Sequence, residues 1–153
     1  MKVKTIDVVN AYGVLVSVKV AALSDDAALA VWHNLKGFRS IVENYNKSIE
    51  VAQKSLQDEE FEKMQDRAQA YNVKLKEYQK EGKEPTDDMK VEVAEINKFF
   101  NERNSKAEKY FNELKNTVND IDVDLVEETE MLKALKSSDK GYAALMTVSW
   151  LVK

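Results

Sequence analysis

Apolar residues recur every three or four positions through the first half of the chain. They are Ala28, Val31, Leu35, Phe38, Val42, Tyr45, Ile49, Ala52 and Leu56. This spacing lines up one apolar stripe along one face of an α-helix. The spacing is interrupted at Glu59 and Glu60, where an apolar residue is due. After one additional step of four residues, apolar residues continue as far as Tyr78. Because such an insertion locally unwinds a superhelix without ending the helix, the pattern predicts one long helix over residues 24–81.

A second stripe with the same spacing predicts a helix over residues 86–118. Its members are Met89, Val93, Ile96, Phe100, Arg103, Ala107, Tyr110, Leu114 and Val118, of which Arg103 is the one polar residue. Between the stripes, Gly82 suits the left-handed residue that ends a helix, Pro85 forbids continuation, and Thr86 or Asp87 can cap the next helix. Because this connection is short, the two helices should form an antiparallel hairpin.

The first helix of this hairpin is nearly twice as long as the second. Its leading half, around Val31, Leu35 and Phe38, therefore has no partner within the hairpin. We expect these three residues to pack on the terminal segments of the chain or on a second copy.

The terminal segments have weaker patterns. In residues 1–23 we favour a helix that begins after Thr5 and gives way between Gly13 and Ser17, although the valines from Val14 to Val20 alternate as in a strand. In residues 119–153, acidic and apolar residues alternate from 120 to 125, which predicts a short half-buried strand. A short helix should follow. The last segment has helical spacing, but residues 147–152 could also extend as a strand beside residues 120–125.

Composition places these elements in one mainly α domain that spans residues 1–153. The chain is 44% hydrophobic and 33% charged, and it contains four glycines and one proline. Such a composition is typical of a globular helical protein. The fold class that we predict is a long antiparallel helical hairpin with short terminal helices and one small β element near residues 120–125.

Charge and hydropathy argue against several kinds of partner. The net charge of −4 leaves no excess of Lys and Arg to neutralise phosphates, so we expect no nucleic acid. The charge-free apolar run over residues 8–18 is shorter than the roughly 20 residues that cross a bilayer. We therefore expect no membrane partner, no secretion signal and a cytoplasmic location.

No motif in the chain indicates catalysis or a cofactor. His33 is the single histidine, there is no cysteine, and the four glycines are too far apart for a phosphate loop. The spacing Asp120-x-Asp122-x-Asp124 matches the start of a calcium loop, but Leu125 stands where that loop needs glycine, and Met131 stands where it needs glutamate. We predict a protein that is not an enzyme and that has no metal, cofactor or small-molecule substrate.

Two groups of residues are candidates for contacts with another protein. Phe99 and Phe111 lie one step off the second stripe, so we expect them to face outward, as spare aromatic residues do on a partner surface. The second group is an acidic segment, which could form a negative docking patch or keep an edge strand soluble. Its members are Asp120, Asp122, Asp124, Glu127 and Glu128.

The order of these features resembles a known group of proteins. An apolar segment at residues 6–11, the sequence His33-Asn34-Leu35-Lys36, a long charged hairpin and the acidic and apolar residues 120–125 resemble small helical proteins encoded by tailed phages and prophages. The resemblance spans most of the chain, implies a phage context and carries over no catalytic residue.

Together these observations favour a non-enzymatic interaction protein. We expect a phage structural or assembly component that uses its hairpin to bind a protein partner or copies of itself, in the host cytoplasm or in the virion. The alternative is a phage-encoded inhibitor or regulator of a host defence protein that acts through its acidic surface.

Overall fold

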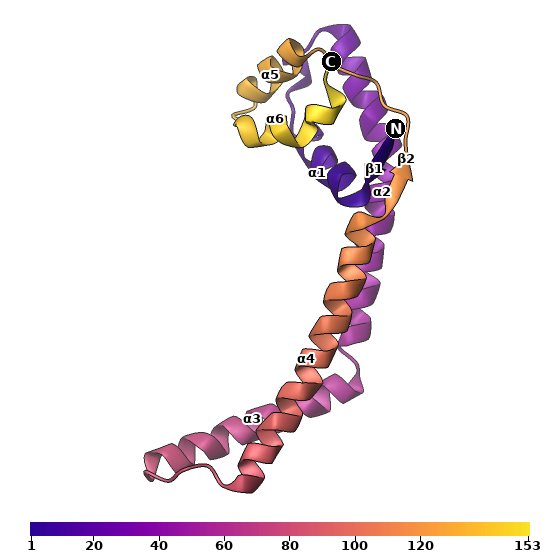
Figure 1. Cartoon of the computed structure of the whole chain (residues 1–153). Coiled ribbons are helices and arrows are strands. Elements are labelled where there is room, and N and C mark those ends of the chain that lie inside the picture. The colour runs from indigo at the N-terminus through magenta and orange to yellow at the C-terminus, as the bar shows by residue number, and fades with distance from the viewer. The chain divides into compact units, whose positions relative to one another are not determined.

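The computed structural model describes all 153 residues and has a mainly α fold with one small antiparallel sheet, which confirms the predicted fold class (Figure 1). The order of elements is β1 (Lys2–Lys4), α1 (Thr5–Leu15), η1 (Val20–Ala22), α2 (Asp25–Leu56), α3 (Glu59–Lys80), α4 (Asp87–Asn116), β2 (Val118–Asp120), α5 (Glu128–Ser137), α6 (Tyr142–Val148) and η2 (Ser149–Leu151). None of the helices combines the length and the apolar character needed to span a membrane.

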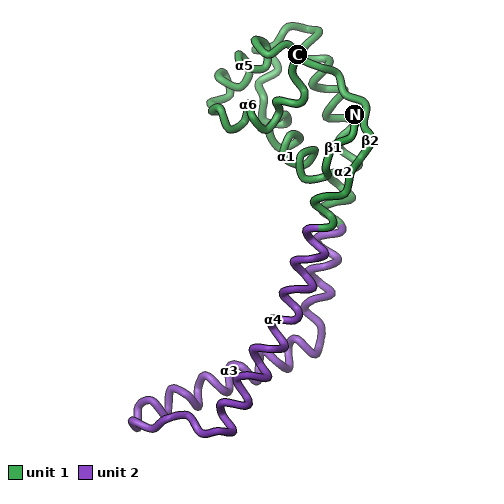
Figure 2. Tube along the Cα trace, in the orientation of Figure 1, with its two compact units in different colours: residues 1–47, 113–153 green, residues 48–112 purple.

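The chain divides into two compact units, whereas its composition predicts one domain (Figure 2). Unit 1 comprises residues 1–47 and 113–153, and unit 2 comprises residues 48–112. Helices α2 and α4 contribute residues to both units.

Unit 1 is built around the two ends of the chain. Helix α1 begins at Thr5 and ends at Leu15, as predicted. Strand β1 pairs antiparallel with β2, with Val3 opposite Asn119. Ser24 caps α2, since its Oγ accepts a hydrogen bond from the N–H of Ala27 at 3.4 Å.

The core of unit 1 joins the leading half of α2 to the terminal segments. Val31 and Phe38 are buried, and Leu35 packs against the same cluster, which confirms packing on the terminal segments, the first of the two expected alternatives. The other large members come from both termini: Val3, Val8, Leu15, Val126, Met131, Leu135, Val148 and Leu151. The core therefore depends on contacts between residues that are far apart in the sequence.

The predicted strand over residues 120–125 is wrong in its position. Strand β2 covers residues 118–120, and residues 121–125 belong to no ladder. The backbone of Asp124 bonds to the side chain of Asn34 instead, and a single parallel bridge joins Val126 to Val152. Because residues 149–151 form the 3₁₀ helix η2, no strand from 147 to 152 is available to pair with this segment.

Unit 2 contains the helical hairpin of α3 and α4. Gly82 ends α3 with a φ of 68°, and the N–H of Lys83 bonds to the carbonyl of Tyr78 at 2.9 Å, which completes a Schellman cap. Thr86 caps α4 by accepting a hydrogen bond from the N–H of Met89 at 3.3 Å. Glycine and threonine thus play the parts that the sequence predicts.

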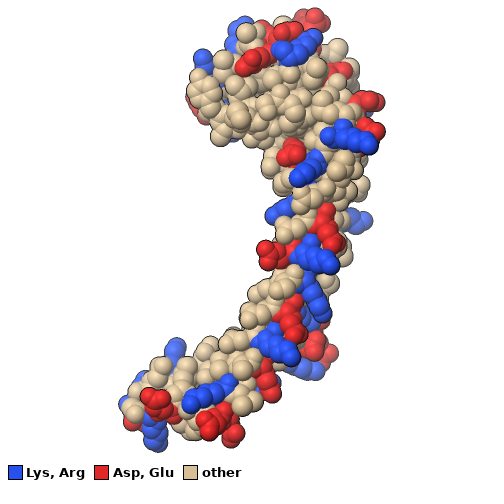
Figure 3. Space-filling view, viewed as in Figure 1, with Lys and Arg blue, Asp and Glu red and all other residues tan.

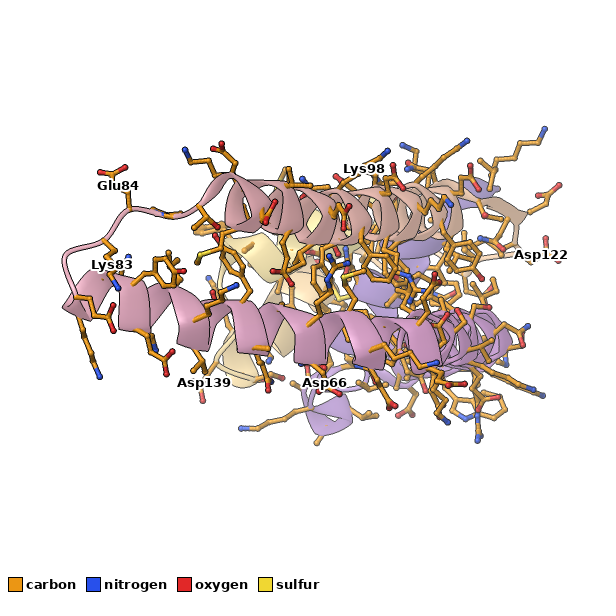
Figure 4. The ribbon with its side chains drawn as sticks, turned by 90° about the horizontal axis from the view of Figure 1, so that it is seen from below. Asp66, Lys83, Glu84, Lys98, Asp122 and Asp139 are labelled. Carbon is orange, nitrogen blue, oxygen red and sulfur yellow. The ribbon has the colours of Figure 1, made fainter.

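A narrow apolar seam holds this hairpin together. Its buried residues are Tyr71, Met89 and Ile96. Charged side chains such as Asp66 on α3 and Lys98 on α4 point away from the seam (Figure 4). Arg67 of α3 also reaches across to α4, where it pairs with Glu95 at 2.7 Å and Glu92 at 3.4 Å.

The prediction of one continuous helix over residues 24–81 is wrong. Helix α2 ends at Leu56 and α3 begins at Glu59. Asp58 has extended backbone dihedrals and caps α3, since its carboxylate accepts a hydrogen bond from the N–H of Phe61 at 2.9 Å. The slip in the apolar stripe therefore marks the end of one helix and the start of the next.

Candidate functional site

Arg103 of α4 contacts the break between α2 and α3. Its guanidinium donates hydrogen bonds to the carbonyl of Leu56 and to the carboxylate of Asp58, both at 2.6 Å, and to the carboxylate of Glu60 at 3.3 Å. The Arg103 side chain is 19% exposed. The single polar residue of the second stripe thus satisfies the last carbonyl of one helix and binds the capping residue of the next.

The same arginine affects the ionisation of Asp58. The hydrogen bond from Arg103 holds the pKa of the Asp58 carboxyl below its ordinary value, and the hydrogen bond from the N–H of Phe61 lowers that pKa further. Asp58 therefore stays ionised, and it stays a hydrogen-bond acceptor, to a lower pH than an ordinary aspartate does.

Phe99 lies beneath Arg103 on α4. The guanidinium carbon of Arg103 is 4.9 Å from the centre of the Phe99 ring, within the range of a cation–π contact. Phe99 also meets Phe100 edge to face at 5.4 Å, and Phe100 meets Phe61 of α3 in the same way at 5.6 Å. Phe99 is half-buried, so the expectation that it faces fully outward is only partly met.

An open groove of about 360 Å³ lies beside this pair. Its lining combines the apolar faces of Leu56 and Phe99 with two bases and two acids, and the full set is Ser55, Leu56, Glu60, Phe99, Glu102, Arg103 and Lys106. An aromatic ring, an arginine and a mixed polar rim are typical of the centre of a protein–protein contact. This Phe99 groove is the candidate functional site.

Phe111 differs from its prediction. It is half-buried, and its neighbour Tyr110, which the second stripe includes, is 41% exposed. The two rings meet at 6.0 Å. The half-buried residues of α4 follow one another in steps of four, from Arg103 to Ala107 and then to Phe111. The predicted stripe takes a step of three after Ala107 and therefore includes Tyr110 in place of Phe111.

The acidic candidates lie in unit 1, and most of them contact groups of the same unit. Asp120 pairs with the N-terminal ammonium at 3.3 Å, Asp124 with His33 at 2.8 Å, and Glu127 with Lys153 at 3.5 Å. Asp122 and Glu128 are exposed and form no ion pair, and Asp122 points away from the ribbon (Figure 4). The structure therefore leaves two of the five acidic candidates, Asp122 and Glu128, outside any such pair.

A second hollow is lined by residues of α2 and by two of the acidic candidates. It has a volume of about 510 Å³ and is lined by His33, Asn34, Lys36, Gly37, Ser40, Asp122 and Asp124. The His33–Asp124 contact was missed because 91 residues separate the partners in the sequence. No group of three or more side chains that could hold a metal ion occurs in the structure.

The surface of unit 1 also exposes two large hydrophobic residues that are not among the predicted interaction candidates. Tyr142 and Met146 of α6 are 78% and 73% exposed, although both have the spacing of a buried helix face. The signal that could have identified them is the absence of any charged residue from 141 to 152.

No protein-family model, curated protein or solved structure matches this chain. The candidate site is therefore defined by the geometry of the chain itself. Its strongest elements are the half-buried Phe99 ring, the arginine that covers it and the groove that both residues line.

Proposed function

We propose that the protein is a non-enzymatic interaction protein that binds a protein partner through the Phe99 groove. The observation that carries this proposal is the half-buried Phe99 ring, covered by Arg103 and open to a groove of about 360 Å³. Aromatic residues and arginine dominate the energetic centres of protein interfaces because they bury a large area and keep polar contacts.

The groove suits an apolar side chain with polar neighbours. Leu56 and Phe99 supply apolar walls, while Glu60 and Glu102 oppose Arg103 and Lys106 in sign. A partner residue that enters the groove would remove water from the Arg103–Phe99 contact, and that contact is stronger when it is desolvated. The mixed rim favours a partner of mixed charge over a polyanion.

The groove is held in place before any partner arrives. Arg103 is tied to Leu56 and Asp58 at 2.6 Å, and Phe100 connects Phe99 to Phe61 on the neighbouring helix. A surface that is ordered in advance loses little side-chain entropy on binding. This order supports a recognition role for the helix break.

The resemblance to phage-encoded proteins supports a structural or assembly role for this contact. The alternative, a regulator of a host protein that acts through its acidic surface, has weaker support. Asp120, Asp124 and Glu127 already contact the N-terminal ammonium, His33 and Lys153 of the same chain, so docking through them would first break those contacts.

The test compares variants of the groove in cells that naturally produce the protein. We expect Phe99→Ala and Lys106→Glu to reduce recovery of a copurifying protein by about tenfold or more, as loss of a central interface residue does. Lys74→Glu is the matched control, because Lys74 is exposed on α3 and makes no ion pair.

The readout is the amount of partner protein recovered per tagged chain, with helix content measured by circular dichroism for each variant. Equal recovery with the native chain, both groove variants and the control would contradict the proposal. So would the absence of any protein retained at a fixed ratio by the native chain.

A further inference from the structure

Unit 1 has a surface area without charged side chains over α6 and over the part of α1 that follows Asp7. Residues 8–18 and 141–152 contain no charged residue, and α1 packs against α6. Figure 3 shows the resulting uncharged area. Tyr142 and Met146 project from it, 78% and 73% exposed. Apolar area of this kind on a folded protein usually marks a contact with another molecule.

A small apolar notch borders this surface between α5 and α6. Leu132, Leu135 and Leu145 line it together with the ring of Tyr142, and its volume is about 70 Å³. Lys136 and Lys140 stand at its edge. The notch can therefore receive one aliphatic side chain that has acidic neighbours.

Hydrogen bonds hold the backbone of the loop between α5 and α6 in place. Asp139 adopts a left-handed φ of 54°, and the N–H of Lys140 bonds to the carbonyl of Leu135 at 2.9 Å. The N–H of Lys19 donates to Ser138 Oγ at 2.9 Å, which brings a third lysine to this loop. None of Lys19, Lys136 and Lys140 forms an ion pair, whereas Lys133 pairs with Glu130.

A complementary feature lies at the other end of α5. Leu125 is 41% exposed, although both of its neighbours are anchored. Asn34 makes two hydrogen bonds to the backbone of Asp124, and Val126 forms the bridge to Val152. Leu125 is thus held as an ordered apolar knob, with the unpaired carboxylates of Asp122 and Glu128 nearby in the sequence.

We propose that Leu125 of one copy inserts into the α5–α6 notch of a second copy of this chain. Its acidic neighbours, Asp122 and Glu128, would then face Lys136 and Lys140. The knob cannot reach the notch of its own chain, because the ten residues of α5 separate the two features and the anchors on both sides of Leu125 hold it in place.

This contact joins two different surfaces, so it is heterologous. After two copies associate, one copy still has a free notch and the other still has a free knob, so association continues into a ring or an open chain. Opposite charges at the rim make the association weaken as salt increases. The contact lies within unit 1 and does not involve the Phe99 groove of unit 2.

The test uses one variant for each half of the contact. Leu125→Ser removes the knob without adding charge, and Tyr142→Asp places a carboxylate at the notch. Leu29, another exposed apolar residue of unit 1, carries both control substitutions, Leu29→Ser and Leu29→Asp. Light scattering measures mass against protein concentration, and circular dichroism verifies that each variant is folded.

The native chain and both controls should form assemblies larger than one chain at rising concentration. Each notch or knob variant alone should remain at the mass of one chain, with an association constant lower by about tenfold or more. A mixture of the two variants should form a dimer that grows no further, because one intact knob meets one intact notch. A native chain that stays monomeric, variants that assemble as the native chain does, or a mixture that stays monomeric would each overturn the proposal.

Discussion

Asn34 shows how one buried polar side chain can take the place of a strand. It is 2% exposed, its amide group donates to the carbonyl of Asp124 at 2.8 Å, and its carbonyl accepts from the N–H of Asp124 at 2.9 Å. These two bonds satisfy a backbone segment that has no ladder partner. They also position Asp124 beside His33 and anchor the residue that precedes Leu125.

We predict that Asn34→Ala lowers the free energy of unfolding by about 2–3 kcal/mol, because it leaves the backbone N–H and carbonyl of Asp124 without partners. The control is Asn44→Ala on the exposed face of the same helix, which should change that free energy by less than about 0.5 kcal/mol. Chemical denaturation measures both values. Equal effects of the two substitutions would show that the Asn34 amide does not support residue 124.

The helix break at residues 57–58 is the element on which the Phe99 groove depends. Arg103 joins the end of α2 to the start of α3 through Leu56 and Asp58. The hydrogen bond from Arg103 to Asp58 lowers the pKa of this carboxyl in the folded protein. The bond therefore contributes its full stabilisation above the ordinary aspartate pKa. That stabilisation is lost as the pH falls through the lowered pKa.

We therefore predict that unit 2 loses stability in acid below about pH 4, the ordinary range of aspartate. In Asp58→Asn the same loss should be smaller, since asparagine can cap a helix but does not titrate. Thermal unfolding monitored by circular dichroism, from pH 7 down to pH 3, measures the difference. An identical pH dependence in the native chain and in Asp58→Asn would contradict the assigned role of this carboxylate.

The elements that the sequence predicts well are those with local signals. The stripe of α4, the caps at Ser24 and Thr86, and the glycine turn at Gly82 each depend on residues a few positions apart. The helix break has a local signal as well, because Asp58 followed by Glu59 and Glu60 is a typical helix start. The apolar stripe on both sides obscured it.

The features that escaped prediction depend on partners distant in the sequence. Strand β1 exists because residues 118–120 lie beside it, and Asn34 is buried because Asp124 needs its amide. Arg103 was visible as the odd residue of its stripe, but its target at Leu56 was not. Periodicity identifies the buried face of a helix, and it does not identify which residue meets that face.

At the scale of the whole molecule, the two units differ in how their apolar residues are buried. Unit 2 buries Tyr71, Met89 and Ile96, whereas unit 1 has a larger core drawn from both ends of the chain. Opening free energies within a protein follow the density of buried apolar contacts. Unit 2 should therefore open more readily than unit 1.

Hydrogen exchange can measure this difference residue by residue. We expect amides in α3 to exchange about tenfold faster or more than those in the buried turns of α1 and α5. Helix α3 carries exposed residues on most of its surface, so its hydrogen bonds are open to local fraying. Equal protection in α3 and α1 would contradict this prediction, because the small seam of unit 2 would then protect its amides as well as the larger core of unit 1 does.

The most direct test of a protein partner at the Phe99 groove is site-specific photocrosslinking in the cells that produce the chain. The photoreactive residue benzoylphenylalanine replaces Phe99, and in a matched control it replaces Val73, an exposed apolar residue of α3 in the same unit. We predict one discrete crosslinked protein from position 99 and none from position 73. No adduct from position 99, or the same adducts from both positions, would contradict it.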